Sequence, residues 1–462
     1  MIGTEIWDAR DDLTLSDFAQ IGDVLRATGF GTECDGEGTQ GDLSHPFRNA
    51  LQALFERSAR IDATGADGAL DTDTRDLLLQ SGFVARDGDT FVPMVRIERL
   101  HDLFIAGDLK GADRTRDDAV FAVSGTTRIL DNLRVNRPVG HAVDLGSGSG
   151  ALALRLAKHA KRVSAVDINP RAIAYTRVNA AMNRIGTVTA YQGSLYEPLN
   201  GELAELILGN LPFVLSPDQR HLYRDGDRPG GKILTDAVQG AVDHLAPGGV
   251  AQFTCNWPIR GADATAWLRD LASQTKYDAL AIEYKRRTPL DHARNWNRIA
   301  DAPNPAEQLA LERRWADWFA AQGIDHIAFG ALNLRRPIMA RNGRFDAVVA
   351  EKLPEDSGGG QQIERMIRAM DAPLAPDSVP IAVPHMVYQQ LVHDGASYTS
   401  MPAEFFCLDS AGIGLTVLPE VTPALLAVDG KTPITEIADP DDPGHAVLLE
   451  AYRRGLIDLA VA

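Results

Sequence analysis

The sequence has few cysteines, no long apolar run and no excess of basic residues. Its three cysteines, Cys34, Cys255 and Cys407, lie far apart and form no Cys-x-x-Cys pair. Neither a disulfide framework nor a zinc site is expected from such spacing, and we predict no bound metal. No stretch approaches the roughly 18 consecutive apolar residues of a membrane-spanning helix. The opening MIGTEIWDARDD lacks the basic and apolar regions of a signal peptide, so a cytoplasmic protein without membrane association is predicted.

Basic residues are outnumbered, since 46 Lys and Arg against 63 Asp and Glu give a net charge of −17 over 462 residues. The deficit lies at the two ends. Residues 1–100 carry 19 acidic and 9 basic side chains, and residues 381–462 carry 11 and 3. Acidic surfaces repel a phosphate backbone, so neither end is expected to clamp nucleic acid, whereas the nearly neutral middle leaves that question open.

The chain is long enough for several domains, and its patterns suggest three with one linker. Residues 1–110 combine helical apolar spacing, as in Leu15 to Leu25, with a hairpin pattern at 82–94, which predicts a helical, winged-helix-like domain. Given its acidity, we favour a packing or substrate-recognition module over a DNA reader. The other predicted parts are a catalytic domain at 111–355, a linker at 356–380 and a small C-terminal domain at 381–462.

Short apolar runs alternate with helical segments from residue 141 to residue 255. Such alternation predicts a parallel sheet with right-handed helical crossovers, and hence an α/β fold of the Rossmann-like, doubly wound type. A polar helical stretch at 288–325 is predicted to be an insertion between late strands. Residues 327–334 and 344–349 are then expected to form a closing antiparallel pair.

The clearest local motif is Asp144-Leu-Gly146-Ser147-Gly148-Ser-Gly150, at the end of the first strand of this region. Glycines let the backbone approach a ligand, and the following helix N-terminus offers N–H groups to an anion. The spacing fits a methyltransferase loop, a dinucleotide fingerprint or a plain strand-to-helix turn. Asp167 ends the next strand, where a carboxylate can bind ribose hydroxyls, or simply favour the following helix through its dipole.

A second motif, Asn210-Leu211-Pro212-Phe213, directly follows another strand. Ligands of open α/β sheets bind at the carboxyl ends of strands, so Asn210 is expected beside the ligand of the glycine loop. A hydride-transfer enzyme has no need of such a group. The alternatives are a capped turn and a core phenylalanine.

With these motifs, residues 141–257 resemble the class I S-adenosylmethionine-dependent methyltransferases that carry an [Asn/Asp]-Pro-Pro-[Tyr/Phe] motif. That branch includes the release-factor glutamine and rRNA guanine-N2 methyltransferases. The resemblance implies a seven-stranded sheet, S-adenosyl-L-methionine as cofactor and catalysis by orientation. The acceptor nitrogen would donate to the Asn210 side-chain oxygen and the Leu211 carbonyl, with Pro212 shaping the turn and Phe213 stacking on the substrate.

The resemblance also assigns residues around the cofactor and the substrate. Cofactor contacts are implied for Asp144, Gly146, Ser147, Gly148, Gly150, Asp167, Ile168, Ser194, Leu195, Asn210 and Thr126. Thr126 belongs to Ser-Gly-Thr-Thr at 124–127, which is equally typical of a helix cap. Substrate contacts are suggested for Phe213, His221, Tyr223, Arg224 and Trp257, although the middle three also suit a solvated loop and Trp257 a core position.

Two positions depart from the branch pattern. Leu211 replaces the first proline, and Ser194 stands where an acidic residue is usual. Pro212 still favours an extended Leu211, and neither change removes a group that the chemistry needs. The C-terminal domain weakly resembles the winged-helix, leader-peptide-binding chaperone of pyrroloquinoline quinone biosynthesis, and a domain that merely packs on the core is the favoured interpretation.

The sequence therefore predicts an S-adenosylmethionine-dependent methyltransferase that acts on an amide, amino or guanidino nitrogen of a small molecule or peptide. The alternatives are an rRNA guanine-N2 or protein-glutamine methyltransferase and, from another class, a non-catalytic cofactor- or peptide-binding protein. The substitution at Leu211 would then mark a dead site.

Overall fold

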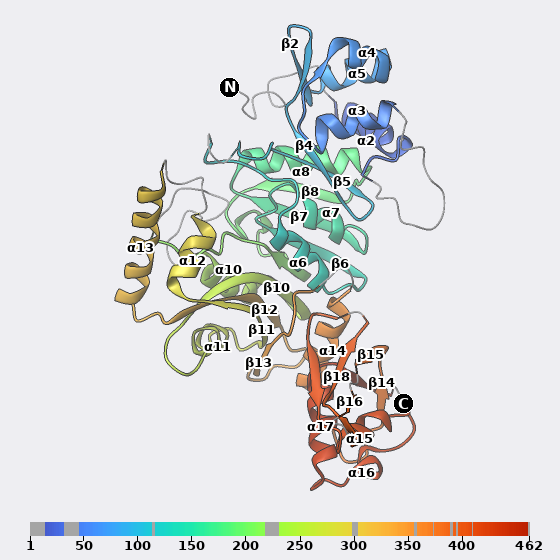
Figure 1. Ribbon diagram of the computed structural model, residues 1–462, viewed down its shortest axis with the longest axis vertical. Coiled ribbons are helices and arrows are strands. Elements are labelled where there is room, and N and C mark those ends of the chain that lie inside the picture. Colours follow the sequence, from blue (N-terminus) through green and yellow to red (C-terminus); the bar gives the residue numbers. More distant parts are fainter. Residues whose placement is uncertain are drawn as a thin grey trace. The chain divides into compact units, whose positions relative to one another are not determined.

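The computed structural model describes residues 14–31, 46–112, 116–217, 231–297, 304–354, 358–372, 374–388, 391–393, 396–408 and 410–460. The chain divides into two compact units, which are described in turn (Figure 1). The first comprises Met1–Arg128, Pro138–Ala246 and Ala293–Trp318, and the second Ile129–Arg137, Pro247–His292 and Phe319–Ala462.

The first unit begins with a small helical module that carries a three-stranded sheet in the order β1-β3-β2. The helix predicted around Leu15–Leu25 and the hairpin predicted at 82–94 are confirmed. Aspartates that precede two helices cap them, since Asp62 accepts from Gly65 N and Asp71 from Thr74 N, each at 2.7 Å. The elements are α2 (Leu15–Ala27), α3 (Pro46–Phe55), β1 (Ile61–Asp62), α4 (Ala63–Ala69), α5 (Thr72–Gln80), β2 (Val84–Asp87) and β3 (Thr90–Pro93).

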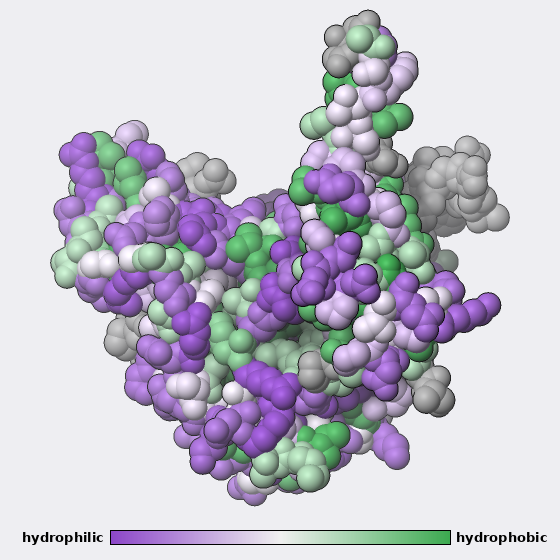
Figure 2. All heavy atoms as spheres, turned by 90° about the horizontal axis from the view of Figure 1, so that it is seen from below, coloured by the Kyte–Doolittle hydropathy of each residue, from purple (hydrophilic) through white to green (hydrophobic). Residues whose placement is uncertain are grey.

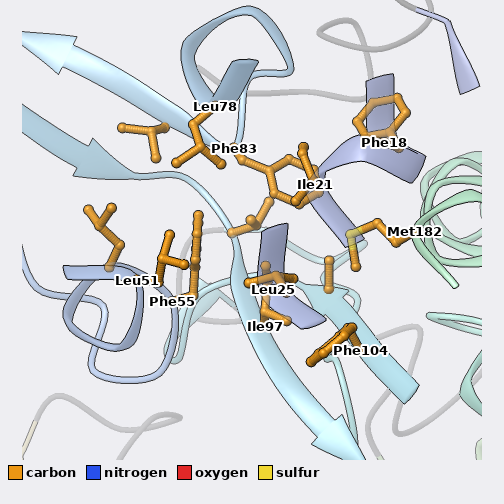
Figure 3. Packing of buried hydrophobic residues seen from close by; sticks show 14 of the residues in the cluster. Phe18, Ile21, Leu25, Leu51, Phe55, Leu78, Phe83, Ile97, Phe104 and Met182 are labelled. Carbon is orange, nitrogen blue, oxygen red and sulfur yellow. The ribbon is translucent and has the colours of Figure 1, made fainter. Parts of the chain in front are cut away.

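One hydrophobic core joins this module to the rest of the first unit. Figure 3 shows Phe18, Ile21 and Leu25 of α2 beside Phe83 and Met182. Met182 belongs to α8 (Pro170–Met182), a helix of the central sheet, and it is part of the same buried cluster. The module therefore packs against α8 and is not connected to it by a linker alone.

Four parallel strands form the part of the central sheet in the first unit, in the order β9-β6-β7-β8. The predicted alternation of strands and helices is confirmed. Helix α7 ends at Leu156. The elements are β6 (Val139–Leu145), α7 (Ala151–Leu156), β7 (Ala160–Asp167), α8, β8 (Val188–Gln192), η2 (Glu197–Leu199), β9 (Ala204–Gly209), α10 (Lys232–His244), α12 (Pro289–Trp296) and α13 (Pro305–Ala321).

A hairpin that the sequence analysis missed, β4 (Arg96–Leu100) with β5 (Leu103–Gly107), leads into this sheet. Its second strand is fully buried. The Asn179 side chain of α8 pairs with both backbone polar groups of Ala106, at 2.8 and 2.9 Å. These two hydrogen bonds resemble those between paired strands, and they hold the hairpin against α8.

A buried charged cluster follows β5. The Asp108 carboxylate accepts both Arg171 Nε, at 3.1 Å, and an Arg171 terminal nitrogen, and it also accepts Tyr175 Oη at 2.8 Å. Its Oδ2 accepts Val120 N at 2.7 Å. Asp108 is 4% exposed and Arg171 5%, so these charges are compensated by one another and by hydrogen bonds rather than by water. The cluster ties Asp108 and Val120 to the N-terminal half of α8.

The second unit holds the mixed part of the central sheet, in which β10 (Leu245–Ile259), β12 (His326–Arg335) and β11 (Asp278–Arg287) pair antiparallel. Its remaining elements here are α11 (Ala266–Ser273) and β13 (Phe345–Val349). The predicted antiparallel pair of 327–334 with 344–349 was wrong, because β11 lies between them and β13 runs parallel to β11. This extra edge strand makes the sheet eight-stranded rather than seven-stranded.

The C-terminal part of the second unit combines short strands with helices around its own core of buried residues such as Phe405 and Leu448. Inside the predicted linker, residues 360–371 form helix α14, whose Ile363, Met366 and Ile367 are buried. The glycine-rich stretch therefore leads into a packed helix. The elements are α14 (Gly360–Asp371), β14 (Pro380–Ala382), β15 (His385–Tyr388), β16 (Leu391–His393), β17 (Tyr398–Ser400), β18 (Ala403–Cys407), β19 (Gly414–Val417), α15 (Thr422–Leu426), α16 (Ile434–Ile437), α17 (Pro443–Arg453) and β20 (Ile457–Leu459).

The surface is mixed in polarity. On the face in Figure 2, hydrophilic residues predominate and hydrophobic ones lie in small groups between them. Among the described residues, no helix is both long and apolar enough to cross a membrane. Within that same part of the chain, no cluster of His, Cys, Asp or Glu has the composition of a metal site.

The first testable prediction concerns the core of the N-terminal module. Leu51→Ala should lower the free energy of unfolding by about 2–5 kcal/mol, because Leu51 is 0% exposed and truncation leaves a cavity. Leu15→Ala is the matched control, because Leu15 is 60% exposed and the change should stay within about 0.5 kcal/mol. Urea denaturation followed by circular dichroism measures both, and equal effects would show that the core is not packed as described.

Candidate functional site

Three neighbouring strands place the predicted site residues side by side. In the parallel register, Leu145 of β6 lies opposite Val166 of β7 on one side and Gly209 of β9 on the other. The next residue of each strand is therefore Gly146, Asp167 and Asn210. The structure thus brings the glycine loop, Asp167 and the Asn210 turn together at the carboxyl ends of these strands, as the sheet topology predicted.

The glycine loop, residues 146–150, turns sharply from β6 into α7. Gly146, Gly148 and Gly150 all have positive φ, of 67°, 52° and 80°, a region that other residues rarely adopt. A Cβ on Gly150 would lie 2.9–3.0 Å from three Thr176 atoms, so this glycine also permits close packing on α8. Gly146 N and Ser147 N donate to Val166 O at 2.8 and 3.1 Å, which anchors the loop to β7.

The middle of the loop is open. A Cβ built on Gly148 meets no atom within 4 Å. Ser147 is buried, and its hydroxyl lies 3.3 Å from the Thr176 hydroxyl. The backbone at Gly148 is therefore the part of the loop that a ligand can approach most closely.

Asp167 is held by the backbone around it. Its Oδ2 accepts Gly148 N and its Oδ1 accepts Asn169 N, both at 2.9 Å. Burial raises the pKa of this carboxyl, while the hydrogen bonds from Asn169, Gly148 and Ile168 oppose that rise. A carboxylate has about four acceptor positions, so a ribose hydroxyl can bind where these three N–H groups do not.

Asp144 has an unusual environment. It is 1% exposed, its Oδ2 accepts Ala153 N at 2.9 Å, and its Oδ1 has no hydrogen-bond partner. Burial, with a smaller contribution from the nearby Asp167 charge, raises the pKa of the Asp144 carboxyl to about 8. A buried acceptor without a partner is costly, and protonation of the carboxyl removes the charge that burial disfavours.

Ser194 and Leu195 follow β8, the strand that pairs with β7, and both are half-buried. Gly193 N donates to Asp167 O at 3.0 Å, which ties this segment to the end of β7. Leu195 has a φ of 50°, a strained value for a residue with a side chain. Ile168, also half-buried, lies beside Asp167. Their predicted cofactor contacts stay predictions.

The Asn210 turn lies directly against the glycine loop. A Cβ on Gly146 would be 3.0 Å from Leu211 Cδ2, so the buried leucine packs under the loop. Asn210 is half-buried, and its Nδ2 donates to Thr127 Oγ1 at 3.2 Å. Phe213 is 8% exposed and contacts the Trp296 ring at 6.1 Å, edge to face. These contacts hold Asn210, Leu211 and Phe213 in place. The catalytic roles predicted for residues 210–213 stay predictions.

The polar segment before α6 (Gly125–Leu133) also meets this turn. Ser124 Oγ accepts Thr127 N at 3.0 Å and lies 2.8 Å from Thr127 Oγ1 and 3.0 Å from Thr126 Oγ1. The capping interpretation of 124–127 is therefore confirmed for Ser124. Thr127 belongs to the predicted 124–127 motif, but its bond to Asn210 was not predicted, because the two residues are 83 positions apart and no local pattern signals the contact.

The remaining candidates differ in what the structure says of them. The contact between Phe213 and Trp296, at the end of α12, was not predicted. Trp296 is one of the tryptophans in the helical stretch 288–325. Trp257 is fully buried and its Nε1 donates to Ala264 O at 2.9 Å, which suits a core position. The suggested substrate residues His221, Tyr223 and Arg224 lie outside the described residues.

The residues present fit S-adenosylmethionine. The open backbone at Gly148 gives room beside the loop, and the Asp167 carboxylate retains acceptor positions. These two features agree with a nucleoside ligand.

The second prediction uses Asp144. Its folded-state pKa of about 8 exceeds the value near 4 of an unfolded chain, so the folded state holds a proton that the unfolded chain loses. The stability that this group contributes is complete below about pH 4 and is lost as the pH rises toward 8. Asp144→Asn, an uncharged isostere, should flatten this decline in urea midpoints measured on the ligand-free protein from pH 5 to 8. Parallel curves for the two proteins would contradict the buried, protonated state.

Comparison with known proteins agrees with this geometry. Residues 119–276 match the model of the "Methyltransferase small domain" family. A release factor glutamine methyltransferase of Geobacter sulfurreducens is 36% identical over 121 residues, which cover 23% of this chain and 42% of that protein. The ribosomal protein L11 methyltransferase of Bradyrhizobium diazoefficiens is 29% identical over 160 residues, 31% of this chain and 51% of that protein.

Among solved structures, a ribosomal protein L11 methylase from Lactobacillus delbrueckii subsp. bulgaricus shares 19% identity over 47% of this chain and 81% of that one, with a TM-score of 0.28. That score is too low to support a functional argument. The chain spans about half the length of the curated relatives it matches. Residues 119–276 therefore carry the sequence pattern of a methyltransferase small domain, and the homologues imply S-adenosyl-L-methionine as the cofactor.

Proposed function

We propose that this protein is a methyltransferase that transfers the methyl group of S-adenosylmethionine to a nitrogen, with the carboxamide of a peptide or protein as the favoured acceptor. The observation that carries the proposal is the register of β7, β6 and β9, which places Asp167, Gly146 and Asn210 at adjacent strand ends. The curated relatives named for protein glutamine support a carboxamide over a small molecule.

The acceptor nitrogen would be held by two oxygens of the Asn210 turn. Bound S-adenosylmethionine would supply an electrophilic methyl group on a positively charged sulfur. The Asn210 carboxamide oxygen and the Leu211 carbonyl each accept one N–H of the acceptor, so its lone pair is aimed rather than free to rotate. Orientation of this kind supplies much of the rate of a bimolecular transfer. The nitrogen would form the new N–C bond as the methyl–sulfur bond breaks. The sulfur would keep that bond's electron pair and leave as a neutral thioether, and the nitrogen would then lose one proton to water.

The aromatic pair Phe213 and Trp296 would form the wall on which a planar acceptor packs. Phe213 follows Pro212 in the turn, and the ring of Trp296 meets its edge. An amide plane packs well against an aromatic face, and the rings exclude water from the reacting atoms. Asp167 would hold the ribose, and the open backbone of the glycine loop would face the rest of the cofactor.

The module before the sheet has the element order of a winged helix. Helix α3 is followed by β1, then α4 and α5, then the β2–β3 hairpin, with β1 paired to β3. Because residues 1–100 are strongly acidic, we assign this module to packing and substrate recognition rather than to DNA. The same acidity disfavours the rRNA alternative. The C-terminal winged-helix-like assignment stays part of this proposal.

The third prediction separates cofactor binding from transfer. Asp167→Ala should weaken S-adenosylmethionine binding about tenfold to hundredfold, because it removes hydrogen bonds to a charged acceptor. Asn210→Ala should lose at most about tenfold in cofactor affinity, as expected for one neutral hydrogen bond, and should transfer no methyl group. Isothermal titration with S-adenosylmethionine, S-adenosylhomocysteine and NAD measures the first effect. Radiolabelled transfer to a glutamine-containing peptide, with its glutamate counterpart as control, measures the second.

Two results would overturn the proposed function. Failure to bind either sulfur nucleoside would remove the cofactor. Binding without transfer to glutamine peptides, amines or guanine-containing RNA would favour the non-catalytic alternative. Transfer to RNA alone would replace the carboxamide acceptor with guanine.

The fourth prediction concerns the aromatic wall. Trp296→Ala should raise the KM for the acceptor about tenfold, since loss of an aromatic contact and of buried area weakens packing, and leave cofactor affinity unchanged. Trp296→Phe is the control and should retain most of the affinity. An unchanged KM in the alanine variant would place the acceptor elsewhere.

A further inference from the structure

The C-terminal part of the second unit contains one long β-hairpin. Its first strand consists of β15 followed by β16, and its second strand of β17 followed by β18. Both halves pair antiparallel, from His385 opposite Cys407 at one end to His393 opposite Tyr398 at the other. The two halves therefore belong to a single structure, residues 385–407, which we call the C-terminal arm.

Only the base of the C-terminal arm is covered. A third strand, β19, pairs with β18 over residues 403–406, and Phe405 belongs to the buried core of this part of the chain. In the outer half, β16 and β17 form a sheet of two strands among the described residues. Every residue of these two strands except Ser400 is exposed. Two strands alone are marginally stable in water, so the outer half is expected to gain stability from a partner surface.

The exposed side chains of the outer half are largely apolar. Leu391 is 61% exposed, Val392 49% and Tyr398 72%. The ring of Tyr398 meets that of His393 with centroids 4.7 Å apart, so these two side chains share one face with Leu391, whereas Val392 lies on the other face. Both faces of the outer half thus present apolar groups to solvent, which is typical of a surface that another protein covers.

The C-terminal arm also lacks the charges that protect exposed strands. Between residues 385 and 403, Asp394 is the only Asp, Glu, Lys or Arg, although 24% of the whole chain is charged. Natural proteins usually prevent unwanted pairing of free strands with charged residues or prolines. Pro402, the one proline of this stretch, lies at the base. The outer strands are therefore open to pairing.

The size of the C-terminal arm fits a small protein interface. At about 3.3 Å per residue and about 5 Å per strand, both faces of the outer half and the outward face of the base offer on the order of 500 Å². Two such surfaces in contact would bury on the order of 1,000 Å² in total, near the lower limit of a specific association. An extended peptide along one edge would leave both faces exposed, whereas a second hairpin can cover a face.

The charge of the chain favours a second copy as that partner. A basic protein would be drawn to the acidic surface, such as that of residues 381–462 with 11 acidic and 3 basic side chains, rather than to an uncharged stretch. Two copies with a net charge of −17 each repel one another over most of their surfaces. Contact between them is least unfavourable where both surfaces are uncharged and apolar, and the outer half of the C-terminal arm meets that condition.

We propose that the C-terminal arm is a self-association surface, through which two copies of this chain form a dimer with two-fold symmetry. A two-fold axis lets the same patch serve as both partners, so the apolar side chains of one arm cover those of the other. Antiparallel pairing of outer strand edges across the axis would also satisfy their backbone N–H and C=O groups. This assignment goes beyond the methyl-transfer chemistry and does not depend on it.

The fifth prediction concerns the oligomeric state of the full-length protein. Sedimentation velocity between about 1 and 100 μM should show a monomer–dimer equilibrium with a dissociation constant in the micromolar range. Leu391→Glu should weaken the dimer at least about tenfold, because it places a carboxylate in an apolar contact of each copy. Tyr398→Glu should act in the same way.

A matched control is Leu426→Glu on α15. Leu426 is 62% exposed against 61% for Leu391, but it lies outside the C-terminal arm. This change should alter the dissociation constant by less than about twofold, as expected of a surface substitution away from the interface. Circular dichroism of the three variants checks that each retains the fold.

Two further measurements locate the contact. Raising the NaCl concentration from about 50 to 500 mM should strengthen the dimer severalfold, because salt screens the repulsion between two acidic copies. Hydrogen exchange of the unaltered protein, measured above and below the dissociation constant, should show protection of residues 385–403 only at the higher concentration. Leu391→Glu should abolish that difference.

The possible results separate clearly. A monomer at every concentration, a dimer that both arm variants leave intact, or an equal loss in Leu426→Glu would overturn the proposed dimer. Weakening by salt would indicate an interface of ion pairs, and protection confined to other residues would place the interface elsewhere, so either result would also overturn it. None of these results bears on the proposed methyl transfer, which the cofactor and acceptor experiments test separately.

Discussion

The parallel pairing of β6 with its two neighbours is the constraint on which the site depends. Leu145 lies opposite Val166 and Gly209, and a shift of either pairing by one residue would turn the following side chain to the other face of the sheet. Asp167 and Asn210 would then no longer flank the glycine loop. The buried side chains of β6 and β9 fix this register, because both strands are almost entirely covered.

Side-chain amides and hydroxyls hold the segments around these strand ends. Asn179 donates to both Ala106 O and Ser149 O, so one residue of α8 connects the β4–β5 hairpin with the glycine loop. Ser149 Oγ in turn donates to Ala122 O at 2.6 Å. Hydrogen bonds are directional, unlike the hydrophobic contacts around them. They therefore fix where the hairpin and the glycine loop lie relative to α8.

Much of the first unit could be predicted from the sequence, because its helices and strands follow simple apolar periodicity and its loop glycines have positive φ. Asp167 and Asn210 were found because strand ends meet at one sheet edge. Periodicity did not reveal β11, whose second half is charged and exposed, and this omission led to the wrong pairing of the last strands. The Thr127–Asn210 bond and the raised pKa of Asp144 arise from tertiary burial, which no local pattern records.

The Asp108 cluster has a consequence for where this chain can be divided. The family match begins at residue 119, yet Arg171 and Tyr175, inside that span, depend on a carboxylate that lies before it. A fragment cut at residue 119 would leave a buried guanidinium without its partner, a defect of about 3–5 kcal/mol. It would also expose the face of α8 that packs against the helical module. The segment that matches the family model is therefore shorter than the segment needed for stable folding.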